Sequence, residues 1–113
     1  DNNKMIIASQ GGIELVLKAI NEFPSHEELQ QHGCLALANL ASGKNGDDNS
    51  VIIVSQGGED AIVAAKKRFP NNELLVDWAR FVEGTCFGAR LRLKRARRTR
   101  FGRIVPRWMR RKK

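Results

Sequence analysis

The chain has 113 residues, which is enough for one compact unit or for a piece of a longer repeat array. Two cysteines, Cys34 and Cys86, are too few for the disulfide framework of a small secreted domain. No stretch approaches the roughly 18 to 20 apolar residues of a membrane span, and no targeting peptide precedes the first apolar run. These features exclude multi-domain enzymes, disulfide scaffolds and membrane-spanning proteins. They predict an intracellular protein in the cytoplasm, the nucleus or both.

The net charge of +8 is the average of two unlike parts. Residues 1–87 hold 7 Lys and Arg against 12 Asp and Glu, a net charge of −5, whereas residues 88–113 hold 13 against none. We therefore expect an acidic body at 1–87 followed by a basic segment at 88–113.

The body contains an internal repeat with an offset of 46 residues. Ser-Gln-Gly-Gly at 9–12 returns at 55–58, Phe-Pro at 23–24 returns at 69–70, and Ile-Ile at 6–7 returns at 52–53. Glu27 and Leu29 likewise recur as Glu73 and Leu75. A single register accounts for every match, so the chain is predicted to contain two tandem copies of one structural unit, at about 2–41 and 49–87.

In chain order, each copy predicts three helices. The first, at 3–9 and 49–55, is a short apolar run behind Asn3 or Asn49, whose side chain is suited to cap a helix start. The Gly-Gly pair should then bend the chain sharply in both copies. The second helix, at 13–23 and 59–69, has an apolar stripe spaced by three and four residues and ends before a proline.

The third helix is predicted at 26–41 and at 72 to about 86. Leu29 begins a row of small or apolar residues in the first copy, and Leu75 begins its equivalent in the second. We expect this row to pack on the helices of its own unit, with members Leu29, Gly33, Ala36 and Leu40, then Leu75, Ala79, Val82 and Cys86. The Gly-, Asn- and Asp-rich stretch 42–48 reads as the loop between the copies.

These features together resemble the armadillo repeat family. They are the short helix, the Gly-Gly corner, the amphipathic second helix, and the long third helix that ends Leu-Ala-Asn-Leu-Ala at 37–41. The resemblance covers residues 2 to about 87 and implies an all-α superhelix of stacked three-helix repeats. It also implies that the third helices line a groove that binds extended segments of partner proteins.

Family members that bind a peptide backbone use a Trp and an Asn four residues apart on the third helix. Those positions are Leu35 and Asn39 in the first copy and Phe81 and Thr85 in the second, so only Asn39 matches. Binding in the manner of the nuclear import receptors is therefore not expected. Asn39 equally suits a helix-end side chain that serves the nearby loop.

The two positions of the second copy belong to a strongly apolar row on its third helix. It consists of Leu74, Trp78, Phe81 and Thr85. One interpretation is packing against a further repeat or against the basic segment, since aromatic rows at helical spacing usually belong to a core. The other is a partner-binding surface, because aromatic residues often anchor interfaces. Both interpretations predict that this row is covered by something.

No pattern for catalysis, a cofactor or a metal is present. Gly43 and Lys44 lack the second glycine and the Ser or Thr of a phosphate-binding loop. His26 and His32 have no cysteine or carboxylate at the spacing of a metal site. We predict a protein that is not an enzyme and needs no cofactor.

The basic segment has four interpretations. Its cluster around Lys94 resembles a short nuclear-import signal read by an import receptor. Its charge also suits nucleic acid, with Phe101 and Trp108 stacking on bases, or an anionic membrane surface, or the acidic body itself. An altered reading frame or a sequence junction would also produce the abrupt change in composition near residue 88. The residues singled out are Lys94, Arg95, Arg97, Arg98 and Arg100.

The sequence thus predicts a protein-interaction module, a piece of a longer repeat protein that needs further repeats or self-association to cover its apolar ends. The candidate contact residues are Leu35, Asn39, Leu74, Trp78, Phe81 and Thr85. The alternative is a nucleic-acid-binding or nuclear-targeted protein that acts through a basic segment expected to be disordered or only partly helical.

Overall fold

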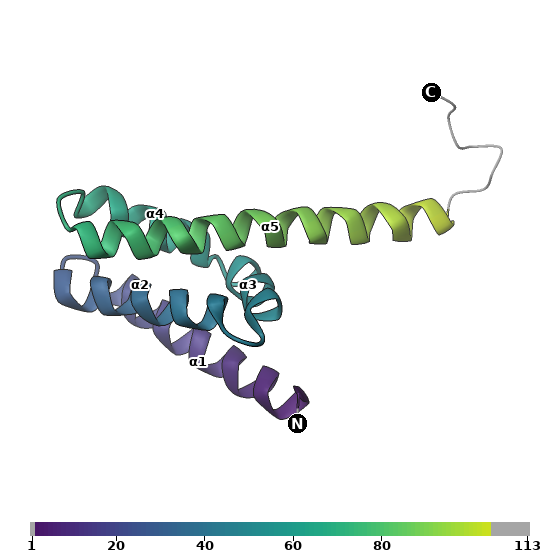
Figure 1. Cartoon of the computed structure of the whole chain (residues 1–113), viewed down its shortest axis with the longest axis horizontal. Helices are drawn as coiled ribbons and strands as arrows, with labels where there is room; N and C mark the ends of the chain where they lie inside the picture. Colours follow the sequence, from purple (N-terminus) through teal and green to yellow (C-terminus); the bar gives the residue numbers. More distant parts are fainter. Residues whose placement is uncertain (1, 105–113) are drawn as a thin grey trace.

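The computed structural model describes the backbone of residues 2–104 and the side chains of residues 11–96. Within this part of the chain there are five α-helices and no strand, which confirms the all-α prediction. The helices are α1 (Asn2–Glu22), α2 (Glu27–Ser42), α3 (Gly46–Ser55), α4 (Gly58–Arg68) and α5 (Glu73–Ile104) (Figure 1). We refer to α1 and α2 as unit one and to α3, α4 and α5 as unit two.

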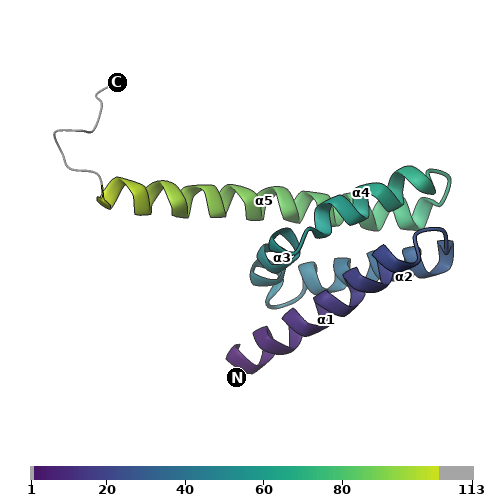
Figure 2. The ribbon, with the colours of Figure 1, turned by 180° about the vertical axis from the view of Figure 1, so that it is seen from behind.

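Helix α2 of unit one and helix α5 of unit two lie side by side and run in the same direction (Figure 1). Seen from behind, α1 crosses α2 on the outside of unit one, and α4 lies along α5 (Figure 2). The short helix α3 fills the space between the units at one end and contacts α1, α2, α4 and α5. Every helix therefore takes part in one continuous packed body.

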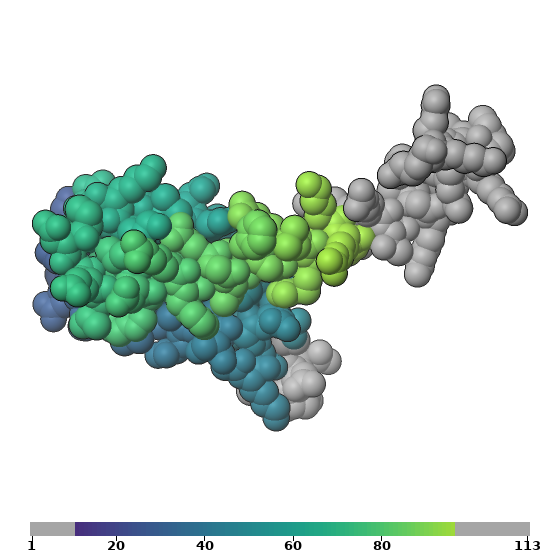
Figure 3. Space-filling model, turned by 45° about the horizontal axis from the view of Figure 1, so that its top comes forward, coloured from purple at the N-terminus to yellow at the C-terminus, as the bar shows by residue number. Residues whose placement is uncertain are grey.

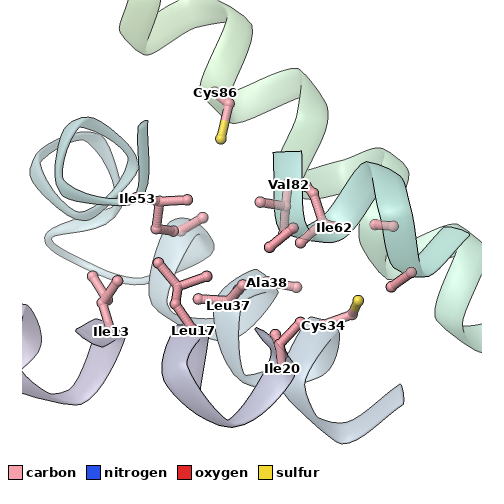
Figure 4. Close-up of a cluster of buried hydrophobic side chains, with 14 of the residues drawn as sticks. Ile13, Leu17, Ile20, Cys34, Leu37, Ala38, Ile53, Ile62, Val82 and Cys86 are labelled. Carbon is pink, nitrogen blue, oxygen red and sulfur yellow. The ribbon is translucent and has the colours of Figure 1, made fainter. Parts of the chain in front are cut away.

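A single hydrophobic core joins the units (Figure 4). Leu17 from α1 and Leu37 from α2 meet Ile62 from α4 and Val82 from α5, and three of these four side chains are fully buried. Full burial of an aliphatic side chain of this size contributes about 1.5 to 3 kcal/mol. The contact between the units is therefore a main source of stability, as expected for a repeat protein.

Two buried amides tie the helix ends to this core. The Nε2 atom of Gln30 donates to the main-chain oxygens of Ile20 and Phe23, 2.9 Å from each, and so satisfies carbonyls at the end of α1. The Nδ2 atom of Asn49 donates to the Leu40 oxygen at 2.8 Å. The prediction that Asn49 caps a helix start is wrong, since α3 begins at Gly46 and Asn49 lies inside it.

The Gly-Gly corner forms in unit two only. Gly57 has φ of 77°, a left-handed conformation that glycine adopts at little cost, and Gly58 lies directly against Ile53. In unit one the predicted corner is absent, because α1 runs without a break through Gly11 and Gly12. The space around those two glycines is open, so no packed neighbour bends the helix there.

The predicted ends at the two Phe-Pro pairs are confirmed. Helix α1 stops at Glu22 and α4 at Arg68, each just before its Phe-Pro pair. The third helices then start with equivalent caps, because His26 Nδ1 accepts from Leu29 N at 3.2 Å and Asn72 Oδ1 accepts from Leu75 N at 3.1 Å. His26 and Asn72 are separated by the repeat offset of 46 residues.

Helix α5 is longer than the sequence predicted. It continues past Cys86 to Ile104, so residues 88–104 of the basic segment are helical where disorder or partial helix was expected. Ala89 is fully buried, and Arg90 forms an ion pair with Glu59 at 3.3 Å, which holds the helix on the body beyond Gly88. Residues 105–113, including Trp108, lie outside the described part of the chain.

No helix in the described part of the chain is both long enough and apolar enough to cross a membrane.

Candidate functional site

The predicted contact residues belong to the neighbouring helices α2 and α5, whose solvent-facing sides we call the α2/α5 surface. On α5, Leu74 is 54% exposed and Phe81 is 45% exposed, and between them Trp78 is half-buried against the core. On the neighbouring helix α2, Leu35 is half-buried and Asn39 is exposed. Large apolar side chains are thus presented to solvent along one row of α5.

Thr85 closes this row at its C-terminal end. It is half-buried, and its Oγ1 atom donates to the Val82 oxygen at 2.9 Å. A hydroxyl that donates in this way keeps lone pairs free to accept a bond from a ligand. Asn39 and Thr85, at equivalent positions of the two units, are therefore the polar groups available at this end of the surface.

The α2/α5 surface is held in register by Asn72. Its Nδ2 atom donates to Glu27 Oε2 and to Gln31 Oε1, both at 2.9 Å, while its Oδ1 atom caps α5. One side chain therefore fixes the start of α5 against α2. This is a fixed arrangement of the kind that lowers the entropic cost of binding.

Charge is distributed unevenly along this surface. Because α2 and α5 are parallel, their N-terminal turns lie at the same end and bring Glu27, Glu28 and Glu73 there, with Asp77 one turn further along α5. At the opposite end of α5, every charged residue from Arg90 onward is basic. A ligand along the surface would meet negative charge at one end and positive charge at the other.

A groove that the sequence did not predict lies between α1 and α2. This α1/α2 groove has a volume of about 550 Å³. It is lined by the apolar residues Val16, Ala19, Ile20, Leu29, Gly33 and Ala36 and by the polar side chains of His26, Glu28 and His32. The residues Leu29, Gly33 and Ala36 were predicted to be covered by their own unit, but Leu29 and Ala36 remain half-buried. Their counterparts Leu75 and Val82 are fully buried. The row that begins at Leu29 recurs at Leu75, so the sequence contained the pattern from which this groove could have been predicted.

The basic residues of the candidate list are only partly described. Lys94 and Arg95 lie exposed on α5, whereas the side chains of Arg97, Arg98 and Arg100 fall outside the described residues. Nearer the body, Arg92 donates to the Asp47 main-chain oxygen at 2.9 Å and lies 3.8 Å from its carboxylate. Helix α5 then extends past the other four helices (Figure 3).

The two thiols have surroundings that suppress reactivity. Burial raises the pKa of Cys34 to about 11. Burial also raises the pKa of Cys86 to about 11, with a smaller contribution from the carboxylate of Glu59. A thiol with so high a pKa is almost entirely protonated near neutral pH and is a poor nucleophile. Among the described residues, no three His, Cys, Asp or Glu side chains cluster to suit a metal ion.

Comparison of the chain with models of protein families, with curated proteins and with solved structures finds no match. The armadillo resemblance therefore continues to depend on the internal repeat of this chain, and the function has to be argued from its own surfaces.

Proposed function

We propose that the protein is a non-catalytic interaction module of the armadillo type, which binds a segment of a partner protein on the α2/α5 surface. The observation that carries this proposal is the exposure of Leu74 and Phe81 in one row on either side of the half-buried Trp78. Apolar side chains of this size, aligned on a rigid helix, are typical anchors of an interface.

The charges at the ends of the surface indicate the chemistry of the partner. An apolar segment would contact the row on α5, and basic residues at one of its ends would lie near Glu28 and Asp77. Such end charges mainly set the orientation of the segment and the rate of association, while the apolar contacts supply most of the affinity.

The test starts from peptides selected on the immobilised chain from a displayed library. Binding of the selected peptides is then titrated by fluorescence anisotropy. Phe81→Ala should weaken binding about tenfold or more, the loss expected of an interface anchor. Phe87→Ala is the matched control, because Phe87 is 56% exposed on a different face of the same helix. Equal effects of the two variants would contradict the proposal.

A second candidate function is binding of nucleic acid, or of an import receptor, through the basic part of α5. It is favoured by the continuation of α5 to Ile104 as a helix that carries no acidic residue after Glu83. A projecting helix of this charge is suited to neutralise a series of phosphates.

This second candidate is tested by measuring RNA affinity at several salt concentrations. Reversing Lys94 and Arg95 to Glu should weaken binding and reduce the salt slope by roughly 2, whereas the same reversal at Lys67 and Arg68 should not. The control pair is also exposed and adjacent in sequence, but it lies at the end of α4. Equal losses from both pairs would indicate attraction by overall charge and would overturn this candidate.

A further inference from the structure

The internal repeat shows what the α1/α2 groove is shaped to hold, because the equivalent face of unit two is occupied. Val16, Leu29 and Ala36 line the groove and are half-buried. At the 46-residue offset they correspond to Ile62, Leu75 and Val82, all of which are 0% exposed. The same kind of face is therefore open in unit one and covered in unit two.

Unit one supplies the cover in unit two. Helix α2 packs along α5, and α1 contacts α4, so that Leu17, Leu37 and Ala38 face Ile62 and Val82 (Figure 4). The covering side chains are apolar and uncharged, and Cys34 and Ala41 on α2 continue the same buried set. A stripe of small and branched residues on two adjacent helices thus fits this kind of face.

A second copy of the chain, stacked head to tail, offers this stripe interrupted by charge. The positions equivalent to Leu17 and Ala41 remain apolar as Val63 and Phe87, but those equivalent to Ile20, Cys34 and Leu37 are Lys66, Arg80 and Glu83. Lys66 and Glu83 form an ion pair, and Arg80 is exposed. Burying these charges in an apolar groove would carry a large desolvation penalty.

We infer that the α1/α2 groove is a docking surface for a further helical unit, one that presents an uncharged stripe of small and branched residues like that of unit one. Ile20 lines the groove where unit two has Lys66, whereas Glu28 and His32, which also line it, correspond to Leu74 and Trp78. The array is therefore open to extension on the α1/α2 side and closed by charge on the opposite side. The groove meets the proposed peptide site at Glu28, but the inference does not depend on that site.

The experiment adds to the full chain a second copy of unit one, whose apolar stripe already covers the equivalent face of unit two. Residues 3–48 are duplicated directly before Asn3, which keeps the 46-residue register and places the stripe of unit one over the original groove. Urea unfolding followed by circular dichroism should then show one cooperative transition with a higher midpoint than that of the natural chain. A separate, earlier transition from the added unit would overturn the inference.

Two variants of the original unit make the test specific. Ala36→Glu places a charge in the groove and should abolish the rise in midpoint, whereas Asn39→Glu places the same charge on an exposed turn of α2 outside the groove. Equal behaviour of the two variants would contradict the inference.

Sedimentation of the natural chain tests whether a second copy of the chain occupies the groove instead. Self-association that Ala36→Glu abolishes would show that a second copy fills the groove, and would overturn the assignment to a different helical unit.

Discussion

Lys66 on α4 and Glu83 on α5 form an ion pair with 2.7 Å between Nζ and Oε1. At the repeat offset they correspond to Ile20 and Leu37, which are 3% and 0% exposed in the core. Unit two therefore carries charge where unit one carries the apolar side chains that contact its neighbour. Both charged side chains are 28% exposed, so the pair adds only about 0 to 1 kcal/mol to stability. Its main effect is to keep this face of unit two in water.

Replacing this pair by the residues of unit one should therefore create an association surface. In Lys66→Ile/Glu83→Leu, the exposed face of unit two gains the apolar residues that unit one uses, and chains should associate head to tail through the α1/α2 groove. Sedimentation velocity across a range of concentrations would detect the larger species. The swapped pair Lys66→Glu/Glu83→Lys keeps both charges and should sediment as the natural chain does. A double apolar variant that sediments identically to the natural chain would refute this interpretation.

The two Gly-Gly pairs should respond oppositely to alanine. Gly57→Ala forces an L side chain into the left-handed conformation and should lower the free energy of unfolding by about 1 kcal/mol. Gly11→Ala lies inside α1 with open space around its Cβ, and should raise the free energy of unfolding by about 0.5 to 1 kcal/mol. Urea denaturation of each variant measures both changes. A loss of stability in Gly11→Ala would show that α1 bends at this pair in solution.

Asn72 should contribute more to stability than its exposed neighbour Asn71. Asn72→Ala removes the cap of α5 and both bonds to α2, and is expected to lower the free energy of unfolding by about 1 to 2 kcal/mol. Asn71→Ala should change it by less than about 0.5 kcal/mol. Chemical denaturation checks the difference, and similar values for the two variants would mean that the network around Asn72 adds nothing.

Cys34 and Cys86 should resist modification in the folded protein. With pKa values near 11 against an ordinary value of 9.0, both thiols stay protonated up to about pH 9, and a thiol reagent at pH 8 should react with them only after unfolding. The raised values favour the fold below pH 9. That contribution is lost as pH rises from about 9 to 11, because only the unfolded thiols then ionise readily.

Replacing both cysteines by alanine should therefore reduce the loss of stability between pH 9 and 11, measured by urea denaturation at each pH. Rapid labelling of the native protein at pH 8, or a pH dependence that the double alanine variant leaves unchanged, would contradict the assignment of both thiols to the core.

Most helix positions could be predicted from the repeat, whereas several helix ends could not. Pro24 and Pro70 mark their ends locally, since proline constrains the residue before it wherever the chain is placed. The corner at Gly57 and the straight path through Gly11 arise from the same four residues, so local sequence does not distinguish them. What differs is the packing, because Gly58 lies against Ile53 while Gly11 and Gly12 have open space around them.

The contact residues could also be predicted only in part. The row from Leu74 to Phe81 was identified from helical spacing, and its partial exposure matches neither a fully buried core nor a fully solvated face. The α1/α2 groove and the charged face at Lys66 and Glu83 were not identified, although both follow from comparing the two copies position by position. That comparison acquires meaning only when it is known which face of unit one contacts unit two.

The sequence by itself determined the helical class, the 46-residue period and the position of the basic segment, because side-chain spacing, proline and net charge act locally along the chain. Only the tertiary structure decided which copies of a repeated residue are buried. Leu29 and Leu75 have the same side chain and the same place in their repeats, yet one lines an open groove and the other is covered. Burial depends on the neighbouring unit, and the two units of this chain have different neighbours.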